Sequence, residues 1–290
     1  MYCFARKTHS YLDLDTGLGF DSQIVVKINA PEVLARQLAS ARWQGAHVAM
    51  GTNVDCYQRA EGRYGLMPGI ITALRDHANP FSILTKGTLI LRDLDLLTQA
   101  ARVTEVGISV SVGFTDQELW RTIEPGTPSP QRRLDVVRTL GEHGIDCGVL
   151  MAPVVPFLGD RPEQLRDTVR AIAESGPSSV TPLVLHLRPG AREWFMQWLR
   201  RHHPGLVGRY ERMYADGAYA PTWYQRRITR QVHELAAQFG MRPADRGASR
   251  RTSGAGTPSG TGSASAPARS RASEGAAPTA PAAPEQLTLL

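Results

Sequence analysis

The sequence has few cysteines, few lysines and no long apolar run. Its cysteines, Cys3, Cys56 and Cys147, lie far apart, form no C-x-x-C pair and do not make an even disulfide set. No stretch approaches the roughly 20 apolar residues that a membrane span needs. The N-terminus also lacks the charged and then apolar pattern of a secretion signal. These absences predict a cytoplasmic protein in a reducing compartment, with no membrane partner.

The scarcity of lysine is itself informative. Only three of the 33 basic residues are lysine, namely Lys7, Lys27 and Lys86. In a chain so biased toward arginine, a lysine indicates a site where the planar guanidinium would not serve. Lys27 and Lys86 are therefore candidate functional residues. The alternative is three accidental surface lysines.

Residues 20–188 alternate between apolar strand patterns and helical patterns. The strand candidates are 47–53, 81–87, 105–113, 146–154 and 179–188. The helical candidates are 31–42, with Asn29 as a cap, and 67–78, 89–102, 130–143 and 162–175. This alternation predicts an α/β fold with a parallel sheet and crossover helices, its strands covered on both faces. A TIM-like partial barrel and an open doubly wound sheet fit the pattern equally well.

After Pro189 the patterns are helical only, at 192–203, 206–214 and 223–239. Nine arginines alternate there with tryptophan, tyrosine and phenylalanine between residues 188 and 230. One interpretation is nucleic-acid binding by phosphate neutralisation and base stacking. The other is a set of amphipathic helices with the aromatic side chains inward and the arginines solvated. The candidate nucleic-acid residues are Arg192, Arg200, Arg201, Arg226 and Arg227.

Residues 2–6, Tyr-Cys-Phe-Ala-Arg, resemble the end of the C-x-x-x-C-x-x-C loop of radical S-adenosylmethionine (SAM) enzymes. Seven further segments resemble the spore photoproduct lyase-like, or DNA repair photolyase-like, branch of actinobacterial type. They are Ile-Val-Val-Lys (24–27), Gly-Thr-Asn-Val-Asp (51–55), Leu-Thr-Lys-Gly (84–87), Leu-Arg-Asp-Leu-Asp-Leu-Leu (91–97), Ile-Ser-Val-Ser (108–111), Ala-Pro-Val-Val-Pro (152–156) and Leu-Arg-Pro-Gly (187–190). The resemblance covers residues 1–240. It favours a partial TIM-like (β/α)6-type barrel without its first strand, a core at 1–188 and a helical cap at 189–243.

The resemblance implies a [4Fe–4S] cluster and SAM as cofactors. Cys3 matches the third cluster ligand, whereas the positions of the other two precede the chain. A lone thiolate cannot hold such a cluster. The chain as written is therefore expected to be inactive, with Met1 an internal methionine mistaken for a start. The resemblance assigns no catalytic residue, and it implies cofactor-binding roles for Tyr2, Asn53, Asp55, Lys86, Ser109, Ser111 and Met151.

The sequence also departs from the spore photoproduct lyase pattern at the hydrogen donor. The position of the donor cysteine, aligned on Asp55, is Thr52 here, and a hydroxyl hydrogen is too strongly bound to replace a thiol. Cys56 lies nearby, but a small buried hydrophobic residue is the simpler interpretation of it. The departure puts photoproduct reversal in doubt.

From about Gly247 the chain has no aromatic residue, valine, isoleucine or methionine, so residues 244–290 are predicted to be a disordered tail. The tail ends in Glu-Gln-Leu-Thr-Leu-Leu, which resembles the peptide that docks bacterial replication and repair proteins onto the sliding clamp. The clamp-binding candidates are Gln286, Leu287, Leu289 and Leu290. The alternative is a chance C-terminus.

The function that these features predict is hydrogen abstraction by a radical SAM enzyme on DNA or another nucleic acid, including DNA repair. Its electrons would come from a reductant such as flavodoxin or ferredoxin. The first alternative is a catalytically silent protein that keeps the barrel and binds nucleic acid or the clamp. The second is a radical SAM enzyme that acts on protein or RNA.

Overall fold

The computed structural model describes residues 1–3, 5–6 and 18–241. The predicted disordered tail and its clamp-like end at Gln286, Leu287, Leu289 and Leu290 lie outside these described residues. The boundaries predicted at residues 188 and 243 stay a prediction. No helix among the described residues is long and apolar enough to cross a membrane.

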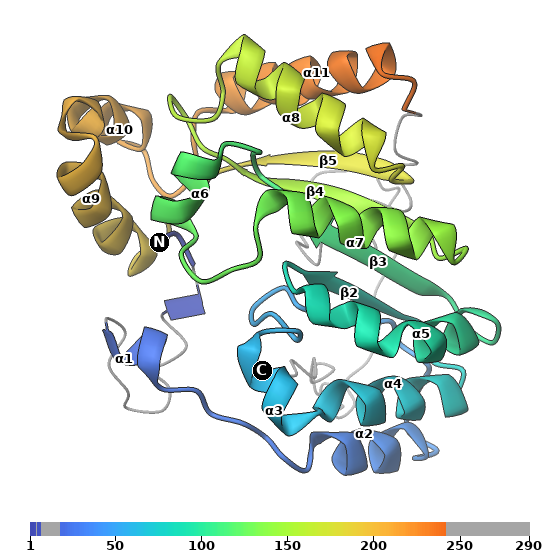
Figure 1. Ribbon diagram of the computed structural model, residues 1–290. Helices are drawn as coiled ribbons and strands as arrows, with labels where there is room; N and C mark the ends of the chain where they lie inside the picture. Colours follow the sequence, from blue (N-terminus) through green and yellow to red (C-terminus); the bar gives the residue numbers. More distant parts are fainter. Residues whose placement is uncertain (4, 7–17, 242–290) are drawn as a thin grey trace, which may run out of the picture. The chain divides into compact units, whose positions relative to one another are not determined.

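Five parallel strands form one sheet in the order of the chain (Figure 1). They are β1 (Val48–Met50), β2 (Phe81–Thr85), β3 (Val106–Ser111), β4 (Cys147–Val154) and β5 (Ser179–Val184). Each strand pairs with the next, so every connection is a crossover that returns the chain to the same end of the sheet. The predicted α/β class with a partial TIM-like barrel is confirmed.

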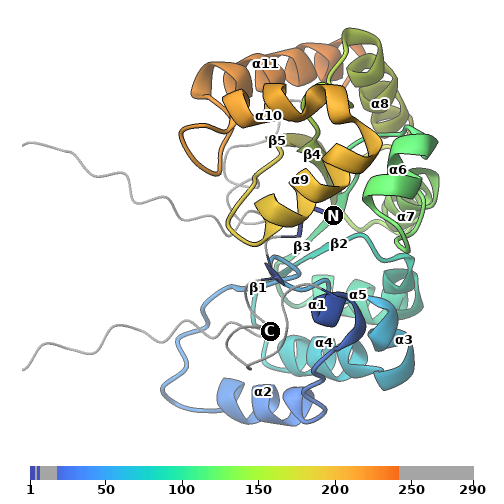
Figure 2. The same ribbon diagram turned by 90° about the vertical axis from the view of Figure 1, so that its left-hand side faces the viewer.

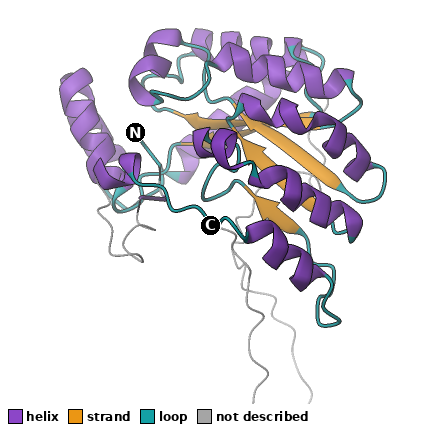
Figure 3. Ribbon diagram, turned by 60° about the horizontal axis from the view of Figure 1, so that its bottom comes forward, coloured by secondary structure: helices purple, strands orange, loops and turns teal. Residues whose placement is uncertain are grey.

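Helices line the outer side of the sheet (Figures 1 and 3). Those between and before the strands are α1 (Leu18–Ser22), α2 (Ala30–Leu38), α3 (Arg59–Tyr64), α4 (Leu66–Asp76), the 3-10 helix η2 (Thr88–Asp93), α5 (Leu94–Ala101), α6 (Gln117–Ile123), α7 (Pro130–Glu142) and α8 (Pro162–Glu174). Those after the sheet are α9 (Ala191–His202), the 3-10 helix η3 (Pro204–Leu206), α10 (Val207–Met213) and α11 (Thr222–Gln238). α2 packs on α4, α4 on α5, and α11 on both α8 and β5.

The core lies between these helices and the strands. β2 buries Phe81, Ser82 and Ile83 in succession, as expected for a strand that is covered on both faces. α4 contributes Ile71 and Leu74, which have no exposed surface. Each large apolar side chain buried in this way stabilises the fold by about 1.5–3 kcal/mol.

Several predicted elements differ from the structure in their bounds: the strand predicted at 179–188 ends at Val184, and the helix predicted at 31–42 is Ala30–Leu38. The first strand ends at Met50 rather than at residue 53, because Gly51 has φ +88° and turns the chain. The helix predicted at 89–102 begins as η2 and becomes α-helical only at Leu94. Asn29 does precede α2, but its side chain makes no capping hydrogen bond. The short helices α1, α3 and α6 were not predicted.

The carboxyl ends of all five strands meet at one edge of the sheet. Figure 2 looks onto this edge, and the N-terminus lies in front of it, near α6 and α9. In parallel barrels the ends of the strands carry the functional side chains. The predicted site residues are therefore expected to lie at this edge.

Candidate functional site

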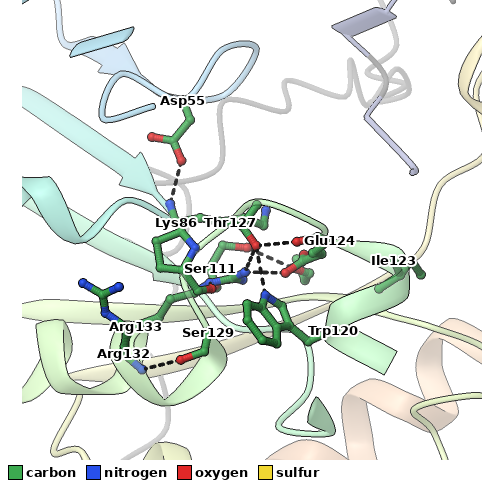
Figure 4. A network of polar contacts seen from close by, with 12 residues as sticks. Asp55, Lys86, Ser111, Trp120, Ile123, Glu124, Thr127, Ser129, Arg132 and Arg133 are labelled. Atoms are coloured by element: carbon green, nitrogen blue, oxygen red, sulfur yellow. Dashed lines mark hydrogen bonds and ion pairs between the residues drawn. The ribbon is translucent and has the colours of Figure 1, made fainter. Parts of the chain in front are cut away.

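The carboxylate of Asp55 holds the turn after β1. Its Oδ1 accepts hydrogen bonds from the Tyr57 amide at 3.0 Å and from the Thr85 hydroxyl at 2.6 Å. Its Oδ2 accepts from the Lys86 amide at 2.7 Å (Figure 4). The Thr85 hydroxyl in turn accepts from the Gly87 amide at 2.7 Å. Asp55 thus joins the ends of β1 and β2 and positions Lys86.

Lys86 brings a half-buried ammonium group to this edge. Burial, with a smaller effect from the charge of Arg133, lowers its pKa from 10.5 to about 8, although Asp55 and Cys3 oppose the change. Its Nζ lies 5.8 Å from the centre of the Tyr2 ring. Within the described residues no carboxylate lies at ion-pair distance from this ammonium. A buried charge without a partner is costly, so an anionic group that reaches Lys86 would be stabilised.

The first residues of the chain lie against the same edge. The Tyr2 hydroxyl donates a hydrogen bond to Glu124, which follows α6. Cys3 is a free, half-buried thiol next to Tyr2 in the chain, and it interacts electrostatically with Lys86. The structure thus brings together four of the predicted residues, Tyr2, Cys3, Asp55 and Lys86.

A buried arginine helps to hold this N-terminal segment. Arg6 is only 3% exposed. Its guanidinium lies 4.3 Å from the centre of the Trp194 ring on α9 and 4.9 Å from that of Phe20 on α1. Such cation–π contacts stabilise most when they are removed from water. The segment that carries the cysteine is therefore anchored to two helices far apart in the sequence.

A buried ion pair lies beneath the site (Figure 4). Arg133 of α7 contacts Glu124 at 2.5 Å, and the two side chains are 1% and 4% exposed. Arg133 also donates to the carbonyl oxygens of Ser111 at 3.1 Å and Pro128 at 2.8 Å, and to the Thr127 hydroxyl at 2.6 Å. Burial raises the pKa of Glu124, and the charge of Arg133 opposes that rise. This network ties the end of β3 to α6 and α7.

Sequence reasoning missed this pair, although one signal was present. Arg133 occupies the apolar stripe of α7, in helical register with the buried Val137 and Leu140. A charged residue at a core position indicates a buried partner of opposite charge, but the sequence pattern of the helix does not identify that partner.

The candidates on β3 and β4 lie in the interior. Ser109 and Ser111 are 5% and 3% exposed, and the Ser111 hydroxyl donates to the carbonyl oxygen of Ala152 at 2.9 Å. Met151 has no exposed surface and belongs to the core. Asn53 is half-buried in the turn after β1. The cofactor-binding roles of these four residues stay predictions.

The two other residues considered from the sequence lie in different surroundings. Lys27 is exposed in the connection between α1 and α2. Cys56 packs against the core, and burial raises the pKa of its thiol far above the usual range, so it stays protonated.

In the C-terminal helices most of the aromatic side chains named are buried, whereas three of the five candidate arginines are exposed. Phe195, Trp198, Tyr210, Tyr214 and Tyr224 are buried, whereas Trp223 is 65% exposed. Of the candidate arginines, Arg200, Arg201 and Arg226 are exposed on α9 and α11. Arg192 donates to the carbonyl oxygen of Tyr214 at 2.9 Å, and Arg227 pairs with Asp160 at 3.2 Å. Two of the five candidate arginines thus bond within the protein, and the nucleic-acid role of all five stays a prediction.

The site fits one of the two predicted cofactors. The Lys86 ammonium suits the carboxylate of SAM. Cys3 supplies one sulfur atom, and within residues 1–3, 5–6 and 18–241 no group of three or more His, Cys, Asp or Glu could hold a metal ion. The described residues alone thus do not fit a [4Fe–4S] cluster, which needs three protein ligands.

Comparison with known proteins finds relatives in Mycobacterium tuberculosis and Methanocaldococcus jannaschii. No family model matches the sequence. The uncharacterised protein Rv2578c of Mycobacterium tuberculosis is 49% identical over 238 residues, which cover 82% of this chain and 70% of that protein. The uncharacterised protein MJ0683 of Methanocaldococcus jannaschii is 28% identical over 203 residues, covering 70% of this chain and 71% of that protein.

Solved structures of spore photoproduct lyase share the fold. A mutant of spore photoproduct lyase, with bound AdoMet and dinucleoside spore photoproduct, aligns with a TM-score of 0.59 at 15% identity. The alignment covers 82% of this chain and 69% of that one. At this identity the likeness establishes a common fold.

Proposed function

The chain belongs to the family of the uncharacterised mycobacterial protein Rv2578c, and we propose that it is a radical SAM protein that acts on nucleic acid. The observation that carries this proposal is Lys86, an ammonium without a carboxylate partner among the described residues, beside Tyr2 and Cys3 at the carboxyl edge of the sheet. The fold shared with a spore photoproduct lyase that binds AdoMet and a dinucleoside lesion supports it.

Each residue at the edge has a distinct role in this proposal. Lys86 binds the carboxylate of SAM through a charge-assisted hydrogen bond, and Asp55 positions Lys86 through its amide. Tyr2 packs beside the ammonium, and Cys3 would be one ligand of the cluster. The exposed arginines of α9 and α11 bind the nucleic-acid backbone.

Replacing Lys86 with methionine is expected to weaken SAM binding about ten- to hundredfold, because a hydrogen bond to a charged group is lost. Equilibrium dialysis with labelled SAM measures the effect. Lys27→Met, at the exposed lysine, is the matched control and should leave the affinity unchanged. Decarboxylated SAM should bind the wild type and Lys86→Met equally. Equal SAM affinity for wild type and Lys86→Met would contradict the proposal.

The lowered pKa of Lys86 also predicts a pH dependence. The ammonium loses its proton at about pH 8 in the folded protein and at 10.5 as an ordinary lysine. Between these values the unfolded chain binds more protons, so the free energy of unfolding rises with pH. SAM affinity should fall over the same range, because the neutral amine no longer pairs with a carboxylate. In Lys86→Met both pH dependences, that of the free energy of unfolding and that of SAM affinity, should disappear. If both persisted in this variant, Lys86 would not be their source.

A second candidate function is nucleic-acid binding without chemistry. The exposed arginines of α9 and α11 favour it, because they need neither iron nor SAM to bind phosphate. The protein should be purified without oxygen from its own cells, and its iron, intact mass and nucleic-acid affinity measured. Iron together with SAM cleavage under reductant supports the enzyme. Nucleic-acid affinity without iron supports the silent binding protein.

A further inference from the structure

A cavity of about 690 Å³ lies outside the candidate SAM site. Its walls come from the connection between β4 and α8, from η3 and α10, and from the start of α11. None of Tyr2, Cys3, Asp55 or Lys86 lines it. Arg161, Arg209 and Arg227 do, and they bring three guanidinium groups to one hollow.

Among the described residues that line this cavity there is one carboxylate, and the protein itself already uses it. Asp160 is 9% exposed, and it accepts hydrogen bonds from the Phe157 amide at 2.7 Å and the Tyr224 hydroxyl at 2.5 Å. It also pairs with Nη2 of Arg227 at 3.2 Å. Three guanidiniums against one carboxylate leave two positive charges. Burial and the nearby His202 lower the pKa of the lining His203, so this histidine adds no charge at neutral pH.

The guanidinium groups of Arg209 and Arg227 are held in position. Arg209 lies 3.9 Å from the centre of the Phe157 ring, a contact that fixes its plane and leaves its N–H edges available. Phe157 adopts φ +65° and packs edge-on against Tyr210. Nε of Arg227 is buried and has no hydrogen-bond partner among the described residues. A buried donor of this kind favours an acceptor from a ligand.

An aromatic side chain stands at the same cavity. Trp223 is 65% exposed, whereas the other exposed aromatic side chains of the described residues, Tyr64 and Tyr219, are 42% and 48% exposed. Its ring packs edge-on against Tyr224 at 5.7 Å between centres, which orients it. An exposed indole next to guanidinium groups offers a face on which a base can stack.

We propose that this cavity binds one nucleotide unit of a single-stranded nucleic acid, with its phosphate on Arg209 and its neighbours and its base on Trp223. The inference rests on the nucleic-acid part of the proposed function and is independent of SAM and of a cluster. A free nucleotide carries the same phosphate and base, so the experiment compares a strand with a free nucleotide.

The test uses fluorescence anisotropy with a labelled oligothymidylate of about 12 residues and an abasic strand of the same length. Arg209→Gln is expected to weaken binding of both strands about tenfold and to reduce the salt slope by about 0.7, because one phosphate contact is lost. Trp223→Ala is expected to weaken only the thymidylate strand, by about tenfold. Trp223→Phe, which keeps an aromatic face, should retain most of the affinity.

Arg212→Gln is the matched control, because Arg212 is exposed on the same helix but does not line the cavity. It should bind both strands as the wild type does. Wild-type affinity in Arg209→Gln, or equal losses on both strands in Trp223→Ala, would overturn the proposal. If thymidine monophosphate bound as tightly as the oligomer, the ligand of the cavity would be a free nucleotide and not a unit of a single strand, which would contradict the proposal. Cavity variants should bind SAM normally and Lys86→Met should bind the strand normally, so failures of the two proposals are distinguishable.

Discussion

Replacing Arg133 with methionine is expected to lower the free energy of unfolding by about 3–5 kcal/mol, because the change leaves Glu124 as a buried carboxylate without its counter-charge. The carbonyl oxygens of Ser111 and Pro128 lose a donor at the same time. Urea unfolding followed by circular dichroism measures the effect. The network joins β3, α6 and α7, so the loss should appear as one cooperative transition at a lower urea concentration.

Arg138→Met is the matched control on the same helix. Arg138 pairs with Asp135 at 3.0 Å, but both side chains are about half exposed. An exposed pair contributes little, so this variant should lose less than about 0.5 kcal/mol. Combining Arg133→Met with Glu124→Leu should recover part of the stability, because the unpaired charge is removed as well. Similar losses in Arg133→Met and Arg138→Met would contradict the assignment of a buried ion pair.

Replacing Gly51 with alanine is expected to lower the free energy of unfolding by about 2–5 kcal/mol. Gly51 has φ +88°, and an added Cβ would lie 1.8 Å from the carbonyl oxygen of Leu84 on β2. Either the turn or the strand has to move, and the turn carries Asp55, which positions Lys86. The variant should therefore also lose SAM affinity. Thermal unfolding and dialysis with SAM measure the two effects.

Gly45→Ala separates backbone strain from steric overlap. Gly45 also has a positive φ, +67°, but no atom lies within 4 Å of an added Cβ. This variant should lose only about 1–2 kcal/mol, from the left-handed conformation alone, and should keep its SAM affinity. If Gly45→Ala were as unstable as Gly51→Ala, the close approach to Leu84 would not be the cause.

The sequence predicted the sheet well because its signal is local. Short apolar runs alternate with helical patterns, and each of the five runs became a strand. Asp55 and Lys86 were found through the family resemblance, and Lys86 also through the scarcity of lysine. Each of them follows a predicted strand, and parallel strands end at a common edge. The ends of elements were harder to predict: Gly51 ends β1 through a close approach to Leu84, a residue far along the chain.

The part of the site that was missed depends on contacts between distant segments. Glu124 lies outside every predicted element and Arg133 lies within a predicted helix, and only their packing buries them together. Arg6 likewise gives no sign in the sequence that its partners are Phe20 and Trp194. The aromatic residues of the C-terminal helices are apolar enough to predict burial, but not to predict that Trp223 stays exposed.

Asp160 makes α11 a reporter of what the cavity holds. Through Tyr224 and Arg227 it tethers the start of this helix to a turn more than 60 residues earlier in the chain. A ligand that binds only while the tether is intact stabilises the docked helix by mass action. Amide hydrogen exchange along α11 should therefore slow as the ligand concentration rises, while exchange in α2, at the other end of the sheet, stays unchanged. The backbone of one helix would thus record occupancy without any label on the ligand.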